Sequence, residues 1–548
     1  MKIFSKKVFS LILCICIVFS CFSVAASAVD TDVYYYIDAL EGNDSNSGTD
    51  INSPVKTIAG LTDVIFKPGV KFLFKNGGVY DCTVTLQGLS GTPEKPIVIS
   101  SYGEGEKAIL RTDAVSEVFR LFDCSYITIS NVAISAPNGG GIWIDTLERT
   151  SEGIILDNIY FYDMPNGKVT SRDDFSNGAV GARAAVMVKG LPARSRYAVN
   201  DLTVSNCEVY NCANGVMLWG SWNDQQNPWC EKEDVDPIYN TGILVENCYF
   251  HDMDAEAVVV GICDGALVTN CRAINCCQGE GVDENGEIQY FTAAMWFWGS
   301  INSTIEHCEI AGQKNFGDGM AIDFDSYSHN CTYQYIYSHD NMRFMCNNPN
   351  YTGHHNNTVR YCLSVNDNGG RSSFAVGSCG EHNLNFYNNT LINCGELHFK
   401  NLYNSYIANN IFMLDGKSTI AYDLDNISRG NTFENNCYFN VMTPLIDIKA
   451  LNMAPGFIGT DYTDPNSFKL ASDSPLLGVG STIDGAPEID FFGNKNESVN
   501  IGCYGGVGEE TDTEYEYELP QDMLKRIIRN IIDTIAHEIY VIFDDLFN

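Results

Sequence analysis

A short pattern of paired β-strand segments recurs along this sequence from Ile127 to Phe439, and it is the feature that most limits the fold. Each copy has an alternating strand, then usually Asn, then a small residue of the buried type and a second short strand, as in LTVSNCEVYNC at 202–212. Alignment of the copies gives eleven equivalent positions, at 132, 159, 207, 248, 271, 308, 336, 362, 389, 410 and 436. Most steps are 21 to 28 residues, and the steps of 48, 41 and 37 residues indicate a coil with an inserted loop. A period of this size, built from strands without intervening helices, is typical of a β-solenoid.

The residue before the aligned position is asparagine in eight of the eleven copies: Asn131, Asn158, Asn206, Asn247, Asn270, Asn388, Asn409 and Asn435. A tight turn that needs a left-handed residue favours Asn, whose amide can also bond the identical amide one coil away. We therefore predict an asparagine ladder, in an all-β, single-stranded right-handed parallel β-helix of about eleven coils with terminal caps.

Five of the aligned positions hold cysteine: Cys207, Cys248, Cys271, Cys308 and Cys362. Stacked strands would put these thiols about 4.8 Å apart, but side chains in register point the same way rather than at each other. We therefore predict a column of small buried side chains instead of disulfide bonds. Any disulfides should come from the cysteines off this column, such as Cys230, Cys263, Cys277 and Cys379.

Residues 1–28 carry the pattern of a secretory signal peptide: three lysines, an apolar run at 8–24 and small residues at 26–28. Its removal would change the formal net charge from −36 to −39, because it takes away three lysines and no acidic residue. A charge of this sign repels nucleic acids and anionic membranes. We therefore expect a secreted protein with no nucleic-acid partner and no membrane span.

The remaining sequence divides by its local pattern into five segments. We expect an N-terminal cap at 29–100, the β-helix at 101–453, a C-terminal cap at 454–506, an acidic linker at 507–520 and an amphipathic helix at 521–548. The helix either packs on the solenoid or makes a homotypic or cell-surface contact.

The opening YYYIDALEGNDSNSGT…SPVKTI, the asparagine ladder and the closing SPLLGVG…NIGCYGG resemble secreted bacterial right-handed β-helix proteins of the pectate-lyase-like superfamily. The stretch AAMWFWGSINSTIEHCEI…GDGMAIDFDSYSHNCTYQYIYSHDN, at about 293–341, resembles the corresponding coils of β-helical glycoside hydrolases and polysaccharide lyase relatives. The resemblance implies this fold and polysaccharide cleavage as a class, although a fold alone does not define a reaction.

In such a coil, the strand before the long turn usually belongs to the sheet that carries the groove. Those strands are expected at 141–145, 186–190, 216–220, 257–261, 295–299 and 320–326. Period-two alternation directs Trp219 outward and, by the same count, Lys189, Trp298, Asp323 and Asp325. Insertions border this sheet at about 166–183, 221–240, 278–292 and 347–355. Long loops over one sheet of a solenoid usually form a cleft.

Asp323 and Asp325 share one face of their strand, and Asp318 lies in the preceding turn. Glycoside cleavage needs one carboxyl group to protonate the leaving oxygen and another to act as base or nucleophile. Crowded carboxylates raise at least one pKa, which keeps one of them protonated at neutral pH. We therefore take these three residues as candidate catalytic groups. Solvated surface and a Ca²⁺ ligand set are the alternatives.

Outward tryptophans on a groove sheet suit the apolar faces of pyranose rings, so Trp219 and Trp298 are candidate sugar platforms, and Trp296 is a weaker one. Lys189 and Arg343 are candidate cations for contact with the substrate.

The only cofactor that the residues suggest is Ca²⁺. Glu280, Asp283 and Glu284 could ligate it, although their loop lacks the full spacing of a calcium loop and fits a solvated segment as well. Motifs for zinc, for phosphate binding and for a nucleophilic serine are absent from the sequence.

Hydrolysis of a polysaccharide by aspartate carboxyls is the function that we favour. A Ca²⁺-dependent lyase acting on uronates is the second hypothesis, weakened because Lys189, its candidate base, lies about 20 Å from the carboxylates. A non-catalytic glycan-binding or adhesin β-helix is the third.

Overall fold

The computed structural model places most of the chain between Asp32 and Thr511. It describes residues 32–61, 66–165, 183–189, 197–222, 237–279, 292–314, 319–347, 356–368, 374–379, 383–416, 418–423, 428–447, 449–496 and 498–511. The expected signal peptide, acidic linker beyond Thr511 and amphipathic helix lie outside these residues. Among the described residues, none forms a helix long and apolar enough to cross a membrane.

Nearly all regular structure belongs to three long sheets, which we call A, B and C. Sheet A contains β1 (Val33–Ile37), β2 (Val70–Lys75), β5 (Ile97–Tyr102), β8 (Ile127–Ser130), β11 (Ser151–Asp157), β14 (Val199–Ser205), β20 (Leu244–Glu246), β24 (Leu267–Thr269), β27 (Thr304–Glu306), β30 (Thr332–Gln334), β33 (Thr358–Arg360), β36 (Asn385–Tyr387), β39 (Tyr406–Ala408) and β42 (Thr432–Glu434). Sheet B contains β3 (Val79–Asp81), β6 (Ala108–Arg111), β9 (Val132–Ser135), β12 (Tyr160–Met164), β15 (Glu208–Cys212), β21 (Tyr249–His251), β25 (Arg272–Ile274), β28 (Glu309–Ala311), β31 (Tyr337–His339), β34 (Leu363–Val365), β37 (Thr390–Ile392), β40 (Ile411–Met413) and β43 (Cys437–Phe439). Sheet C contains β4 (Val84–Gln87), β7 (Phe119–Phe122), β10 (Ile142–Asp145), β13 (Ala184–Val188), β16 (Asn214–Trp219), β22 (Val258–Gly261), β26 (Ala293–Trp298), β29 (Met320–Phe324), β32 (Arg343–Asn347), β35 (Phe374–Cys379), β38 (Glu396–Lys400) and β41 (Ile420–Tyr422).

Minor elements complete the described secondary structure. β17 (Ser221–Trp222) pairs with β18 (Pro237–Ile238), and β19 (Asn240–Thr241) pairs with β23 (Cys263–Asp264). The 3₁₀ helices η1 (Ile58–Gly60) and η3 (Pro465–Phe468) lie near the two ends.

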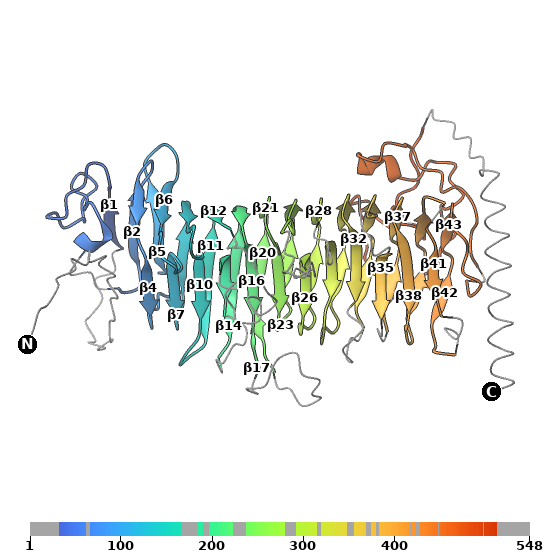
Figure 1. Cartoon of the computed structure of the whole chain (residues 1–548), viewed down its shortest axis with the longest axis horizontal. Helices are drawn as coiled ribbons and strands as arrows, with labels where there is room; N and C mark the ends of the chain where they lie inside the picture. The colour runs from blue at the N-terminus through green and yellow to red at the C-terminus, as the bar shows by residue number, and fades with distance from the viewer. Residues whose placement is uncertain are drawn as a thin grey trace, which may run out of the picture.

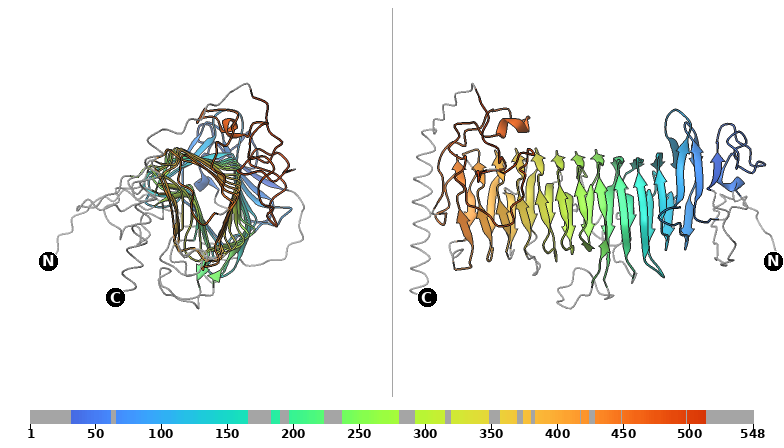
Figure 2. Two further views of the ribbon diagram at one scale, coloured as in Figure 1. Left: turned by 90° about the vertical axis from the view of Figure 1, so that its right-hand side faces the viewer. Right: turned by 180° about the vertical axis from the view of Figure 1, so that it is seen from behind.

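The chain passes through sheets A, B and C in turn, and each strand pairs in parallel with its counterpart in the next coil. Figure 1 shows the coils stacked in a row, and Figure 2 shows the three-sided cross-section along the axis. Parallel crossovers of this kind are right-handed. The right-handed parallel β-helix predicted from the sequence is therefore confirmed.

The stack begins before the first copy of the repeat. Each aligned position lies at the start of a sheet B strand or one residue before it, but β3 and β6 add two earlier strands. Glycines with positive φ, Gly77 at 78° and Gly105 at 107°, occupy the turns before these strands in place of asparagine. The sequence analysis missed these two copies because their turns have glycine in place of asparagine. The segment expected as an N-terminal cap therefore already contains strands of all three sheets.

The turn between sheets A and B has the same backbone conformation in all eleven aligned coils. The residue before the aligned position has φ between 50° and 57°, also where His307, Tyr335 and Tyr361 replace asparagine. Only short polar side chains reach this region at low cost, so the asparagines select the turn. Amide-to-amide bonds join Asn158 to Asn131 at 2.8 Å and Asn409 to Asn388 at 3.3 Å.

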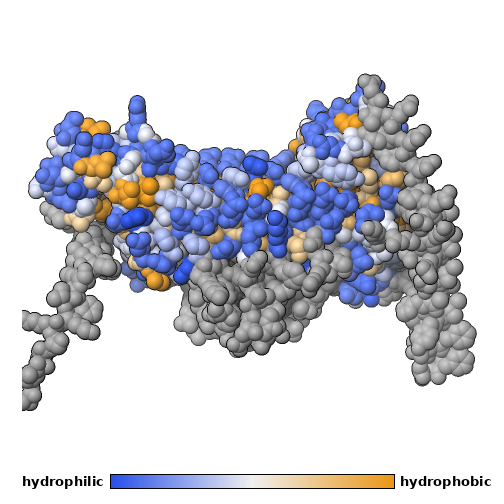
Figure 3. Space-filling model, turned by 45° about the horizontal axis from the view of Figure 1, so that its top comes forward, coloured by the Kyte–Doolittle hydropathy of each residue, from blue (hydrophilic) through white to orange (hydrophobic). Residues whose placement is uncertain are grey.

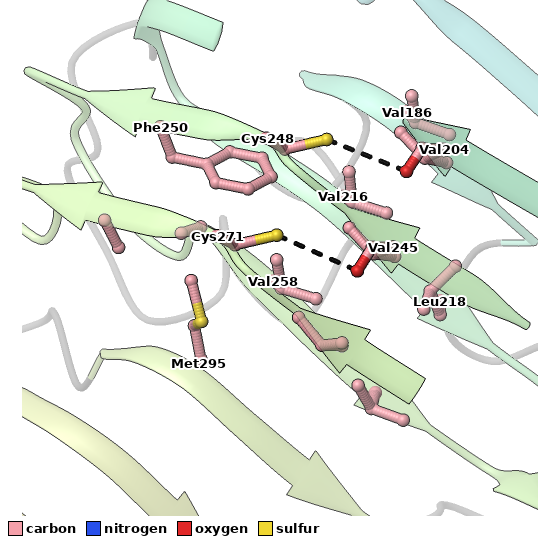
Figure 4. Close-up of a cluster of buried hydrophobic side chains, with 14 of the residues drawn as sticks. Val186, Val204, Val216, Leu218, Val245, Cys248, Phe250, Val258, Cys271 and Met295 are labelled. Atoms are coloured by element: carbon pink, nitrogen blue, oxygen red, sulfur yellow. Dashed lines mark hydrogen bonds between the residues drawn. The ribbon is translucent and has the colours of Figure 1, made fainter. Parts of the chain in front are cut away.

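The aligned positions form a column inside the A–B turn. The thiols at 207, 248, 271, 308 and 362 are all free and buried. Figure 4 shows Cys248 and Cys271 directed at the carbonyl oxygens of Val204 and Val245, at 3.7 and 3.8 Å. The predicted column is thus confirmed. Cys263, expected as a disulfide partner, is a free thiol, which corrects that expectation, and it is buried in the core together with Cys277. Cys230 lies outside the described residues.

Asparagine replaces cysteine in this column in the last three coils. The Asn410 side-chain oxygen accepts a hydrogen bond from the backbone N–H of Asn389 at 2.9 Å. The Asn436 side-chain oxygen accepts one from the backbone N–H of Asn410 at the same distance, 2.9 Å. Asn436 then donates to Asp447 at 2.8 Å. A second amide ladder, which the sequence analysis did not foresee, therefore lies inside the turn.

Different segments cover the two ends of the stack. At the N-terminal end, Ile58, Leu61 and Phe66 pack against the core, and Ile58 begins the short 3₁₀ helix η1. At the C-terminal end, Ile446 and Ala450 pack against the last core residues.

The segment 454–506, expected as the C-terminal cap, lies along the side of the solenoid instead. Phe457 and Leu476 pack on Leu363 and Ile411, outer residues of sheet B. Tyr335 donates a hydrogen bond to the Ile489 carbonyl at 3.1 Å. The outer positions of sheet B are apolar in these late coils, which is why they need this cover. Figure 3 shows the segment rising beside the hydrophilic surface of the middle coils.

We expect the column thiols to be reduced in the folded protein. Burial raises the pKa of Cys362 to about 12, so this thiol is neither ionised nor accessible to oxidants. Alkylation without reduction should label Cys207, Cys248, Cys271 and Cys308 only after unfolding, as read by mass spectrometry. Quantitative pairing of these residues would contradict the column.

We expect Asn410→Ala to lower the free energy of unfolding by about 2–3 kcal/mol, because it leaves the buried N–H of Asn389 and the carbonyl of Phe386 without partners. Urea unfolding followed by circular dichroism measures the change. Asn52→Ala, at an exposed turn, is the control and should change stability by under about 0.5 kcal/mol. Equal midpoints for the two variants would show that the inner ladder contributes nothing.

Candidate active site

Sheet C carries the strands that the sequence analysis assigned to a groove. All six expected segments form strands of this sheet, from β10 to β29. The four expected insertions each lie next to a sheet C strand in the chain. Its inner residues, such as Val216 and Leu218, belong to the main core.

Outer residues of sheet C form rows, because the strands pair in register. One row runs Trp143, Met187, Met217, Val259, Trp296, Asp323 and Cys346. A second row contains Trp219, Gly261 and Trp298, followed by Asp325, whose N–H donates to the Phe297 carbonyl at 3.0 Å. The outward direction predicted for Trp219, Trp298, Asp323 and Asp325 is consistent with these rows.

Trp219 and Trp298 are not open platforms, which contradicts the expectation for them. They are 5% and 1% exposed and pack edge to face, with ring centroids 5.7 Å apart. Gly261 lies between them in register, and a Cβ there would be 2.2 Å from a ring carbon of Trp219. Because Gly261 has no side chain, the two indole rings contact each other across the intervening strand. They are packed within the protein and do not offer an open face to a sugar.

Trp296 and Asp323 are in-register neighbours at the edge of this apolar cluster. Both are half-buried, unlike Met187, Met217 and Val259 of the same row, which are buried. The tryptophan that the sequence analysis ranked lowest is therefore the one with an accessible surface beside a carboxylate.

Asp325 follows β29 and is 9% exposed. Its Oδ1 accepts hydrogen bonds from the Ser326 N–H at 2.6 Å and the Ser326 hydroxyl at 3.0 Å. These two donors fix the orientation of the carboxylate.

Tyr333, which the sequence analysis did not single out, holds the backbone of Asp323 from inside the solenoid. Its hydroxyl donates to the Asp323 carbonyl at 2.6 Å and accepts from the Asp323 N–H at 3.3 Å. Burial raises the pKa of this phenol well above its ordinary value, so the proton stays in place. The register neighbours of Tyr333 are Ile305 and Val359. The sequence did contain a signal for Tyr333, because this residue places one hydroxyl group among the apolar inner residues of its sheet.

Lys189 does not face a groove, and the structure corrects that expectation. It follows β13 in a turn with φ of 52° and is 0% exposed. Its ammonium donates to the Tyr197 carbonyl and to the Ser221 hydroxyl. Burial lowers the pKa of Lys189 to about 8, and the Asp145 carboxylate opposes this shift. The side chain ties two chain segments together and is inaccessible to a substrate.

The remaining candidates divide between buried and undescribed positions. Arg343, at the start of β32, is 6% exposed, so this candidate cation has little surface for contact with a substrate. Asp318, Glu280, Asp283 and Glu284 lie outside the described residues. Within the described part, no group of three or more His, Cys, Asp or Glu side chains is arranged to hold a metal ion.

No family model matches this sequence. Among curated proteins, the chain is 22% identical to the lacto-N-biosidase of Bifidobacterium longum subsp. longum over 557 residues, which cover 84% of this chain and 34% of that protein. The chain thus spans about a third of the length of this curated relative.

Solved structures with a similar fold include the complex of XylC with xylose, with a TM-score of 0.52 at 11% identity over 87% of this chain and 99% of that chain. The GH136 lacto-N-biosidase of Eubacterium ramulus gives a TM-score of 0.47 at 18% identity, over 77% and 66% of the two chains. At 11% identity, the likeness to the XylC structure establishes the fold alone.

Proposed function

We propose that this protein is a secreted glycoside hydrolase whose reaction is carried by Asp323 and Asp325, with Asp318 as the alternative acid. The observation behind the proposal is the pair of carboxylates on the outer side of sheet C, with Trp296 in register beside Asp323. The likeness to a lacto-N-biosidase over 84% of this chain supports the same reaction class.

The two aspartates have different surroundings, which suits different roles. Asp325 is held by two donors from Ser326, as a base or nucleophile must be held for attack on a sugar carbon. Asp323 is half-buried and fixed through its backbone, and a carboxyl group next to an apolar indole can retain a proton for the leaving oxygen. Together they supply the two groups that glycoside cleavage needs.

Trp296 takes the role of sugar platform in this proposal. Its half-buried ring offers an apolar surface one strand spacing from Asp323, about 4.8 Å along the stack. A pyranose that stacks there has its linkage beside the carboxylates. Lacto-N-biosides are the first substrates to test, because the curated relative is named for them.

The lyase hypothesis has less support, since Lys189, its candidate base, is buried and bonded to Tyr197 and Ser221. Secretion rests on the signal-peptide pattern of residues 1–28 and is part of the proposal. Release of reducing sugar from neutral glycans, without unsaturated product absorbing in the ultraviolet, would distinguish hydrolase from lyase. A protein that binds these glycans without cleaving them would be a non-catalytic binder.

Asp323→Asn and Asp325→Asn should each lower kcat by about 10²–10⁴-fold, the usual effect of losing a proton-transferring or nucleophilic group. Binding should change far less, because asparagine keeps the size and most hydrogen bonds. Initial rates on p-nitrophenyl lacto-N-bioside, and on any other glycan that the wild type cleaves, measure the effect. Glu246→Gln, on sheet A, is the matched control and should keep full turnover. Wild-type kcat in both aspartate variants would refute the site.

Tyr333→Phe should lower kcat by about 10-fold, since loss of the hydroxyl removes about 1–1.5 kcal/mol of fixation at the Asp323 backbone. The phenyl ring keeps the core packed, so the thermal midpoint should fall by only a few degrees. KM should change little if the residue positions the carboxylate. If the thermal midpoint falls by this amount and kcat does not change, the role of Tyr333 is purely structural.

A further inference from the structure

The outer row of sheet C that contains Trp296 and Asp323 continues beyond the carboxylate. It passes in register through Cys346 and Gly377 to His398, because β29, β32, β35 and β38 are successive strands of the sheet. The spacing of the strands places His398 about 14 Å from Asp323 along the stack. The same face therefore carries a further polar position, which the proposed function does not use.

This stretch of the row is accessible, unlike the apolar cluster on the other side of Trp296. Cys346 is half-buried, and the side chain of His398 is 28% exposed. Cysteine has a short side chain and glycine has none, so the row itself places little bulk between Asp323 and His398. The side chains of the row thus leave room for a ligand that extends from the carboxylates along the stack.

A carboxylate accompanies His398 on the outer side of β38. Glu396 lies two residues earlier, with the buried Leu397 between them, and its side chain is 35% exposed. Its Oε2 lies 3.1 Å from Nε2 of His398, within hydrogen-bond distance. Its Oε1 accepts no hydrogen bond from the described residues and is not among their buried polar atoms. The imidazole therefore orients a carboxylate that keeps one oxygen available.

A β-bulge lies opposite this pair. The pairing of β35 with β38 passes from Phe374–Glu396 to Val376–Leu397, so Ala375 is an extra residue in β35. It is the one shift of register among the parallel pairings that the structure describes. Bulges are rare in parallel sheets and are most frequent at sheet edges and next to active sites. Because β41 follows β38 in the sheet, this bulge does not lie at an edge.

We propose that Glu396, positioned by His398, binds a sugar unit of a longer neutral glycan, at a position separate from the one beside Asp323. The carboxylate accepts hydrogen bonds from sugar hydroxyls, and such charge-assisted bonds are about twice as strong as neutral ones. The formal net charge of −36 disfavours an acidic glycan. This inference rests on the proposed function and extends it from the cleaved linkage to the length of the substrate.

The test compares a short and a long substrate with the full chain. The short one is p-nitrophenyl lacto-N-bioside, and the long one is a neutral hexasaccharide that carries the same lacto-N-bioside unit at its non-reducing end. Glu396→Ala should raise KM for the hexasaccharide by about 10-fold, the usual cost of losing a hydrogen bond to a charged group, with kcat unchanged. KM for the short substrate should not change, because this substrate does not reach so far along the stack.

His398 is tested as a positioning residue. His398→Ala should raise KM for the hexasaccharide less than Glu396→Ala does, because the carboxylate loses its orientation but keeps its charge. His398→Gln keeps a donor for Glu396 and should restore most of the affinity. Both side chains are partly exposed, so the thermal midpoints of the variants should match that of the wild type.

Glu246→Gln, on sheet A, is the control for removal of one acid and should leave both KM values unchanged. Equal KM values for the hexasaccharide in the wild type and in Glu396→Ala would overturn the inference. An equal rise in KM for both substrates would also overturn it, because Glu396 would then act at the cleaved linkage.

Binding measured without cleavage separates this inference from the proposed function. Calorimetric titration of the hexasaccharide into the Asp325→Asn variant should give a Kd that rises about 10-fold when Glu396→Ala is added. If the wild type cleaves no neutral glycan and this difference remains, the hydrolase proposal falls and the sugar position stands. If the wild type cleaves both substrates and the difference is absent, the hydrolase proposal stands and the role of Glu396 is wrong.

Discussion

The structure depends on keeping successive coils in register, and the left-handed turn between sheets A and B provides this. A one-residue slip in any strand would exchange its inner and outer faces. The turn residue keeps φ near 50–57° in all eleven aligned coils, so each sheet B strand starts at the same place. Hydrogen-bonding side chains inside the turn add a second constraint, most clearly where Asn389, Asn410 and Asn436 bond from coil to coil.

The same register organises the chemistry of the outer surface. Residues far apart in sequence become neighbours at a fixed spacing, so Trp296 meets Asp323, and Trp219 meets Trp298 over Gly261. The solenoid arranges outer side chains in rows along the stack. The residue types in each row decide whether its side chains are buried against one another or accessible to solvent. Here an apolar stretch from Met187 to Val259 is buried, and the half-buried polar position follows it.

The sequence predicted the fold well because the signal is repeated. Asn and Cys at equivalent positions fixed the period, the turn and the inner column, while coils that begin with Gly77 or Gly105 lacked that signal. The site was predicted less well. Alternation gives the direction of Trp298 and Lys189 but not whether other residues cover them, and both are buried. The contact of Tyr333 with Asp323 crosses the core between two sheets, which strand periodicity cannot reveal.

The lateral segment at 454–506 has a consequence for the order in which the chain can fold. Its contacts reach back across more than a hundred residues, as from Asn500 to Asn388 and from Ile489 to Tyr335. Coils can stack one by one as they emerge from the ribosome, because each contacts its predecessor. The outer apolar residues of the late coils, such as Leu363 and Ile411, gain their cover only when this last segment arrives. A growing chain therefore exposes an apolar flank during synthesis, and a truncated chain would keep this flank exposed to chaperones and prone to aggregation.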